Sequence, residues 1–207
     1  RLKIASSLDG RTAMASGESK WITGNLARQD VQHWRAISGA VITGIETILA
    51  DDPLLNVRQL EGVDLATVIQ PKRVILDRQG RLPLTAKILQ TPDTVIVMGP
   101  FRSELEQMGV VQLEIQSLPE LLQTLKKIQI YDVFVEAGAT LSTAFLQAKL
   151  VDELISYVAP TFLGAKARTM FNAEFDRMAE QLRFKLLDVT QLGDDIRLKL
   201  IPLQEYV

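Results

Sequence analysis

Three absences from the sequence exclude whole classes of function. The 207 residues contain no cysteine, which excludes disulfides, thiolate nucleophiles and cysteine-ligated zinc sites. His33 is the only histidine, so a nucleophile paired with a histidine base has little support, and its mid-helix position favours a solvated side chain. The sequence has neither the G-x-G-x-x-G fingerprint of an ordinary Rossmann site nor the G-x-x-x-x-G-K-[ST] phosphate loop. A bound nucleotide would therefore need another kind of turn.

Charge and hydropathy argue against two further kinds of partner. The formal net charge of -2 is unlike the basic stripe of a nucleic-acid-binding protein. No apolar run approaches the roughly 20 residues that span a bilayer, and no secretory signal opens the chain. With the absence of cysteine, these features favour a cytoplasmic protein. The sequence begins with Arg1 instead of methionine, which suggests a longer parent protein.

Short apolar runs alternate with amphipathic stretches of helix length. Several of the runs, such as 74–76 and 133–135, are continuously apolar, which is typical of parallel strands covered on both faces. The pattern predicts one α/β domain over residues 1–207, with a mostly parallel sheet, flanking helices and an antiparallel C-terminal hairpin. The expected strands are Leu2–Ser6, Ala40–Gly44, Lys72–Asp77, Thr94–Met98, Val110–Leu113, Tyr131–Glu136, Glu153–Pro160, Phe184–Thr190 and Asp195–Ile201. The expected helices are Asn25–Ile37, capped by Asn25, Leu118–Ile128, Leu141–Lys149 and a short turn at Glu46–Ala50.

Lys3 is the first candidate for chemistry. Strand alternation places it on one face with Ala5 and Ser7, while Leu2 and Ile4 take the other face. A lysine whose neighbours are small has room for a ligand. An exposed lysine on an edge strand is the alternative, and spacing alone favours that alternative.

Asp51 is the second candidate. It precedes Asp52 and Pro53, and the proline disfavours helix at Asp52, so that a helix should end here. At that helix end the dipole disfavours a carboxylate such as that of Asp51. A carboxylate in an unfavourable position suggests a role beyond structure, but taken alone the segment is better explained by turn chemistry.

A third polar segment follows the predicted strand that ends at Glu136. Gly138 allows close approach to the backbone, and Thr140 or Ser142 can donate a hydroxyl at the start of the next helix. Ligands of open α/β sheets bind beyond the carboxyl ends of strands, and a helix N-terminus binds phosphate. The segment therefore suits a diphosphate, and ordinary helix capping explains it equally well.

Taken in order along the chain, these segments resemble the reductase domain of the bifunctional riboflavin-biosynthesis deaminase/reductase. The opening match is long enough to be specific, whereas residues 60–118 match only in pattern. The matching segments are Leu2–Ala13, Ser16–Thr23, Ala50–Leu54, Val57–Arg58, Val135–Leu141, Leu150–Leu154 and Ala159–Gly164.

The resemblance implies a dihydrofolate-reductase-like fold, NADPH as hydride donor, and reduction of the ribose of 5-amino-6-(5-phosphoribosylamino)uracil to a ribityl chain. It also implies a deaminase domain upstream in the parent protein, whose zinc ligands this chain lacks. The substrate-binding positions carried over are Ser19, Arg35, Leu55, Arg58 and Glu136. The NADPH-binding positions are Ala5, Trp21, Thr47, Asp51, Gly138, Ala139, Thr140, Leu141, Ser142, Thr143 and Ala144. The polar residues expected near the reacting carbon are Lys3, Asp51 and Glu136.

The residue types suit these roles. Arg35 and Arg58 offer planar forks to a sugar phosphate, and Trp21 offers a flat apolar surface to the nicotinamide. Arg78 departs from the family, which often carries serine or threonine there; it could hold the 2′-phosphate of NADPH or be a solvated loop charge.

Two rival functions remain open on the sequence. One is a related reductase acting on a pterin, which would give Arg35, Arg58 and Ser19 no phosphate to bind. The other is a catalytically silent nucleotide-binding or dimerisation module. In it the strand 151–160 and the terminal hairpin would form the interface of a homodimer or larger homo-oligomer.

Overall fold

The computed structural model describes residues 1–203, and the chain forms two compact units. We call residues 1–28 together with those from 138 onward the discontinuous unit, and residues 29–137 the continuous unit. Helix α1 (Asn25–Ala36) begins in the first and ends in the second. The number of domains that fold independently stays a prediction.

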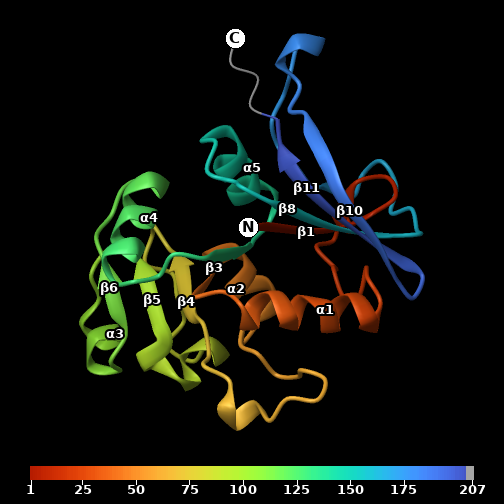
Figure 1. The fold of residues 1–207 in the computed structure, drawn as a ribbon. Coiled ribbons are helices and arrows are strands. Elements are labelled where there is room, and N and C mark those ends of the chain that lie inside the picture. The colour runs from red at the N-terminus through yellow and green to blue at the C-terminus, as the bar shows by residue number, and fades with distance from the viewer. Residues whose placement is uncertain (204–207) are drawn as a thin grey trace. The chain divides into compact units, whose positions relative to one another are not determined.

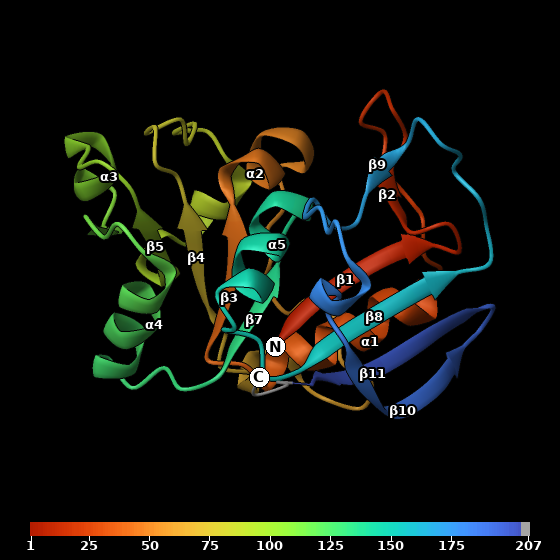
Figure 2. The ribbon, with the colours of Figure 1, turned by 90° about the horizontal axis from the view of Figure 1, so that it is seen from above.

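The continuous unit contains a five-stranded sheet in the order β7-β3-β4-β5-β6, in which every pairing is parallel. Its strands are β3 (Ala40–Gly44), β4 (Lys72–Leu76), β5 (Val95–Met98), β6 (Val111–Leu113) and β7 (Val133–Glu136). Its helices are α2 (Ile45–Asp51), α3 (Ser103–Gln107) and α4 (Leu118–Lys127), with 3-10 turns at Leu65–Thr67, Lys87–Gln90 and Pro92–Thr94. Figure 1 shows α3 and α4 beside β5 and β6, and Figure 2 shows the two helices beside β5.

The core of this sheet explains its parallel arrangement. Two consecutive residues of a strand point to opposite faces of the sheet. Both members of such a pair are fully buried on β3 (Val41 and Ile42) and on β4 (Val74 and Ile75). Both faces of β3 and β4 are therefore covered, as the continuously apolar runs predicted.

The discontinuous unit contains a sheet of four strands in the order β10-β11-β8-β1. Parallel β1 and β8 are followed by the antiparallel strands β11 and β10. The strands are β1 (Leu2–Ser7), β8 (Leu154–Ala159), β10 (Phe184–Leu192) and β11 (Asp195–Pro202). A small second sheet pairs β2 (Arg11–Ala13) with β9 (Arg168–Thr169), and the helical elements are α5 (Ala139–Gln147) and a 3-10 turn at Met178–Glu180. The predicted fold class, a mostly parallel α/β sheet with an antiparallel C-terminal hairpin, is confirmed.

The turn of that hairpin has the conformation that its sequence demands. Gly193 and Asp194 separate the two strands, and Gly193 has φ of 70°. Two-residue hairpin loops favour such positive φ values, which glycine adopts without strain.

The predicted cap of α1 is wrong. The Arg28 amide donates to the Gly24 carbonyl at 3.2 Å, so Gly24 occupies the N-cap position and Asn25 is the first helical residue. The Asn25 side chain instead lies 3.5 Å from the Arg28 guanidinium. His33 is exposed, as predicted. None of the helices in the described chain has both the length and the apolar character needed to cross a membrane.

Candidate functional site

A buried ion pair is the best-defined polar feature of the continuous unit. Nε of Arg35, on α1, donates to Oε1 of Glu136 at 2.6 Å, and Nη2 donates to Oε2 at 3.1 Å. The two side chains are only 9% and 10% exposed. This bidentate arrangement is the strong, geometrically specific form of an arginine–carboxylate contact.

Glu136 lies at the end of β7, where the strand is tied to its neighbour. The hydroxyl of Thr43, on β3, donates to the Glu136 carbonyl at 2.8 Å. The carboxylate is therefore presented from a fixed strand end, the place where open α/β sheets bind ligands.

Arg35 was expected to bind the substrate phosphate, yet it is already engaged. Besides its two contacts with Glu136, it donates from Nη1 to the Asn56 carbonyl at 3.1 Å. A phosphate would have to share these nitrogens. The role of Arg35 as a phosphate ligand stays a prediction, and the geometry favours a role in holding Glu136.

Arg58 has the properties of an anion-binding group. Its side chain is exposed. Partial burial and the positive charge of Arg35 lower its pKa, while Glu136 acts in the opposite direction. The charges of Arg35, Glu136 and Arg58 thus influence one another, and two guanidinium groups with one carboxylate carry a net positive charge. A phosphate would neutralise that charge.

The loop between α2 and Arg58 has a tightly defined backbone. Asp52, after the last residue of α2, has φ of 43°, and buried Leu55 has φ of 52°. The Asp52 carboxylate accepts the amide of Lys87 at 2.8 Å, so this acid has a structural role. Asp51 and Thr47, four residues apart, lie on the same face of α2. The structure brings these two predicted cofactor-binding residues together.

In the discontinuous unit, Lys3 and Ala5 lie on the same face of β1. Both are partly buried, while Leu2 and Ile4 on the opposite face are buried. Lys3 pairs in register with Ile155 of β8. The burial argues against an exposed lysine and is compatible with the predicted role near a ligand.

Trp21 presents a broad apolar surface. Its side chain is 70% exposed, and the Arg28 guanidinium carbon lies 4.5 Å from the ring centroid. That cation–π contact orients the ring. The predicted substrate residue Ser19 lies two residues earlier and is partly buried.

The segment from Gly138 has the features of a phosphate cradle. Gly138 is the N-cap of α5, no side chain caps the helix there, and a Cβ built on it would meet nothing within 4 Å. Of the predicted residues, Thr140 is exposed, whereas Ser142 and Thr143 are buried. A helix N-terminus with open backbone groups fits a phosphate by charge and geometry. The remaining predicted positions, Ala139, Leu141 and Ala144, are partly buried in the same helix.

Sequence reasoning missed Asn172, which binds this cradle. Its Nδ2 donates to the hydroxyl oxygen of Thr140 at 3.1 Å, and its backbone amide donates to that of Thr143 at 2.9 Å. The contacts span 29 and 32 residues, so no local pattern signals them.

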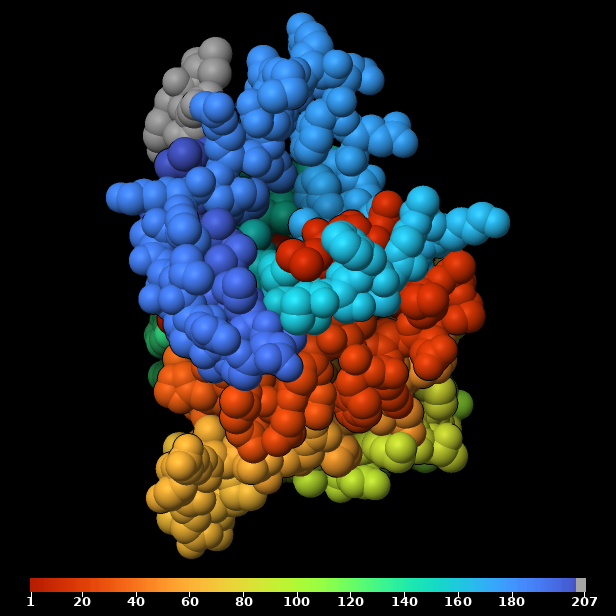
Figure 3. Space-filling view, turned by 90° about the vertical axis from the view of Figure 1, so that its right-hand side faces the viewer, coloured from red at the N-terminus to blue at the C-terminus, as the bar shows by residue number. Residues whose placement is uncertain are grey.

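Asp9 is a second residue that the sequence did not single out. Its carboxylate accepts the amides of Leu163 at 3.1 Å and Gly164 at 2.8 Å. A hydrogen bond from the Ser7 hydroxyl, with these amides, lowers the pKa of Asp9 to about 2. Asp9 thereby ties the turn after β1 to the loop after β8. Figure 3 shows the two segments, in red and light blue, against each other on this face.

Arg78 is exposed in the loop after β4. The loop is shaped by buried Asp77, whose Oδ2 accepts the amide of Leu82 at 2.7 Å. The role of Arg78 as a phosphate ligand stays a prediction.

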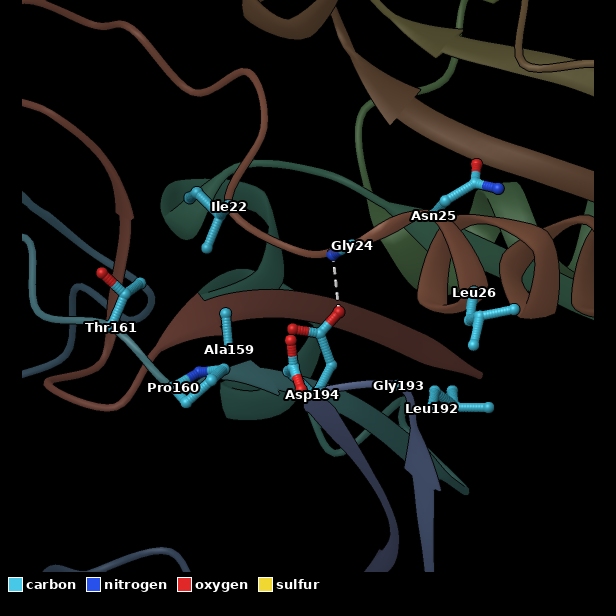
Figure 4. Close-up of a pocket in the computed structure, with 11 residues that line it drawn as sticks. Ile22, Gly24, Asn25, Leu26, Ala159, Pro160, Thr161, Leu192, Gly193 and Asp194 are labelled. Carbon is cyan, nitrogen blue, oxygen red and sulfur yellow. Dashed lines mark hydrogen bonds between the residues drawn. The ribbon is translucent and has the colours of Figure 1, made fainter.

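A cavity of about 380 Å³ lies elsewhere in the discontinuous unit (Figure 4). Buried Asp195 stands at its wall and accepts the Gly24 amide at 2.6 Å. None of the predicted site residues lines it. Its lining residues are Ile22, Gly24, Asn25, Leu26, Ala159, Pro160, Thr161, Leu192, Gly193, Asp194 and Asp195. Within residues 1–203 no group of three or more histidine or acidic side chains could hold a metal ion.

Comparisons with known proteins agree with the resemblance. The sequence model of the family described as the RibD C-terminal domain matches residues 1–198. The riboflavin biosynthesis protein RibD of Haemophilus influenzae is 44% identical, over 98% of this chain and 58% of its own length. This chain therefore spans little more than half of that relative.

A shorter relative and a solved structure extend the comparison. The 5-amino-6-(5-phosphoribosylamino)uracil reductase of Buchnera aphidicola subsp. Acyrthosiphon pisum is 36% identical over 91% of this chain and 99% of its own length. Acinetobacter baumannii RibD, form 1, superposes with a TM-score of 0.97 and 75% identity, covering 99% of this chain and 58% of that one.

Proposed function

The chain belongs to the RibD C-terminal domain family, and from this premise we propose that it is the reductase of riboflavin biosynthesis. Its substrate would be 5-amino-6-(5-phosphoribosylamino)uracil, whose ribose is reduced to a ribityl chain. A relative named for that reduction is similar over 99% of its own length. The observation that carries the proposal is the positively charged cluster of Arg35, Glu136 and Arg58, because a substrate without phosphate would leave Arg58 unneutralised.

The substrate residues divide by what they contact. Arg58, exposed and in excess of the available carboxylate, binds the sugar phosphate through its planar fork. Arg35 holds Glu136, whose carboxylate orients the ribose hydroxyls. Ser19 adds a hydroxyl donor, and buried Leu55 supplies apolar contact.

The family implies a nicotinamide cofactor, and we assign it as NADPH. The backbone at Gly138 and the start of α5, with the Thr140 hydroxyl, would hold its diphosphate. Trp21 would pack beside the nicotinamide with Ala5 near it, and Thr47 and Asp51 would bind from α2. Arg78 would meet the 2′-phosphate. When bound, this cofactor supplies the hydride that reduces the ribose C1 carbon.

Lys3 is the proposed proton donor of the reaction. The open-chain imine of the substrate needs a proton at nitrogen as its C1 carbon is reduced, and the Lys3 ammonium carries one. Asp51 or Glu136 would orient the lysine or the substrate. Lys3 is partly buried on β1.

The test follows NADPH absorbance with the deaminated pyrimidine and with its still aminated precursor. Oxidation that depends on the substrate phosphate, and that falls at least tenfold in Arg58→Met, supports the proposal. Lys3→Ala should lose turnover while still binding NADPH. Activity with dihydrofolate, or equal turnover of a dephosphorylated substrate, would overturn the assignment.

Three further proposals concern the whole protein. A deaminase domain precedes this chain in its parent protein, and mass analysis of the native protein tests this. The parent protein is cytoplasmic, and cell fractionation tests that point.

A homo-oligomer forms through the terminal hairpin, where Leu186, Val189 and Ile196 are 51%, 54% and 42% exposed. Light scattering of Val189→Glu against the unmodified protein tests that interface.

A further inference from the structure

The backbone of segment 56–58 is held by side chains at every residue, although it belongs to no helix or strand. Gln70 forms two bonds with Val57: its Oε1 accepts the Val57 amide at 2.8 Å, and its Nε2 donates to the Val57 carbonyl at 3.0 Å. Gln32 accepts the Arg58 amide through Oε1 at 2.9 Å. The backbone is therefore fixed as far as Arg58, whose side chain carries the guanidinium group.

The contacts of Gln70 imitate those of a neighbouring strand. A residue in a sheet ladder exchanges one donor and one acceptor with the residue opposite, and the Gln70 amide offers the same pair from a side chain. Val57 is 2% exposed, so its amide and carbonyl would be costly to leave without partners. Gln70 supplies both.

Gln32 acts at the next residue from a different direction. It lies on α1, three residues before Arg35, and is 6% exposed. Arg35 on the same helix donates to the Asn56 carbonyl at 3.1 Å. Helix α1 therefore carries Arg35, which holds Glu136, and it also supplies two of the contacts that fix segment 56–58.

We propose that Gln70 and Gln32 are positioning residues for phosphate binding, which they promote by holding Arg58 in its binding geometry. The proposal rests on the proposed function, since it takes the Arg58 ligand to be the phosphate of a sugar. A flexible loop would have to be ordered on binding, and that cost would weaken affinity. A segment fixed beforehand avoids the cost.

A positioning role and a purely structural role predict changes in different measured quantities. If the glutamines only stabilise the fold, their loss lowers the urea midpoint and leaves phosphate affinity intact. If they position Arg58, their loss raises the Kd for a sugar phosphate and the substrate KM, and changes kcat little. At about 1 kcal/mol for each hydrogen bond, losing the one bond of Gln32 corresponds to about 5-fold in affinity, and losing the two bonds of Gln70 to about 30-fold.

The experiment compares Gln70→Leu and Gln32→Leu, each close in size to glutamine, with Gln90→Leu at an exposed position of the same unit as control. Ribose 5-phosphate is titrated calorimetrically into the full chain without cofactor. In parallel, kcat and KM are measured for the phosphoribosylamino-pyrimidine. We expect Kd and KM to rise about 5-fold in Gln32→Leu and up to about 30-fold in Gln70→Leu. We expect kcat to stay within about twofold in both variants, and Gln90→Leu to match the unmodified protein.

An Arg58→Met background makes the test specific. There the glutamine substitutions should have no further effect on the Kd, because effects that act through one group are not additive. An equal effect in both backgrounds, or an unchanged Kd in both glutamine variants, overturns the proposal. So does failure of the unmodified chain to bind ribose 5-phosphate. If the chain binds it with the expected variant pattern but does not reduce the pyrimidine, the proposed function fails and the positioning role stands.

Discussion

Arg35→Met should destabilise the protein strongly, because it leaves the Glu136 carboxylate in a buried place without its cation. The two side chains are 9% and 10% exposed, so water screens little of the loss. Removing one partner of a buried pair costs about 3–5 kcal/mol in the free energy of unfolding. The lost bond to the Asn56 carbonyl adds about 1 kcal/mol. We therefore expect a total near 4–6 kcal/mol.

A double-mutant cycle isolates the pair. Arg35→Met/Glu136→Leu replaces both charges by apolar groups, a change that is often neutral or stabilising relative to a buried ion pair. The double variant should therefore lose much less stability than Arg35→Met alone. Trp34 reports on the continuous unit, since it stacks on Phe134 with ring centroids 6.5 Å apart. Trp21→Phe removes the other tryptophan, and urea unfolding followed by Trp34 fluorescence then gives the free energy.

The reasoning fails on either of two results. A loss below about 1 kcal/mol in Arg35→Met would mean that the pair behaves like a surface salt bridge. A double variant that loses as much as the two single changes together would mean that the charges do not interact. In each comparison the slope of free energy against urea should stay constant, because a changed slope signals an altered unfolded state or a transition that is not two-state.

Two further changes test other contacts. Gly99→Ala places a Cβ 2.1 Å from the Asp77 carbonyl oxygen, and the backbone shift should cost about 3 kcal/mol or more in thermal unfolding; a loss below about 1 kcal/mol would contradict the packing. The pKa of Asp9 is lowered from 3.8 to about 2, so its stabilisation is full above about pH 4 and is lost as the pH falls through 2. Hydrogen exchange at Leu163 and Gly164 should show this acid dependence, and Asp9→Asn should abolish it.

The strands of the continuous unit were predictable because their pattern is local. Residues 40–42 are apolar and Gly44 follows them closely, and the strand β3 has the predicted bounds of 40–44. The shortest elements have too few residues to show any period. Strand β9 has two residues and α3 has five, below the length at which alternation or helical spacing can be recognised.

For the candidate site, the residue types were predictable and their partners were not. Arg35 and Glu136 were both expected to contact substrate, but their 101-residue separation gives no sign that they bind each other. The contact between Asp9 and Gly164 spans 155 residues. Such pairings are products of tertiary packing, so neither propensity nor spacing encodes them locally.

The division of the chain into two units also affects the order in which the units can fold during synthesis. Leu2 of β1 pairs in register with Leu154 of β8, so a ribosome must add about 150 residues before β1 meets that partner. At about 5–20 residues per second this takes roughly 8–30 s. Residues 29–137 emerge complete within that time. Until then the nascent β1 lacks its β8 partner, and an unpaired strand edge can pair with a wrong neighbour.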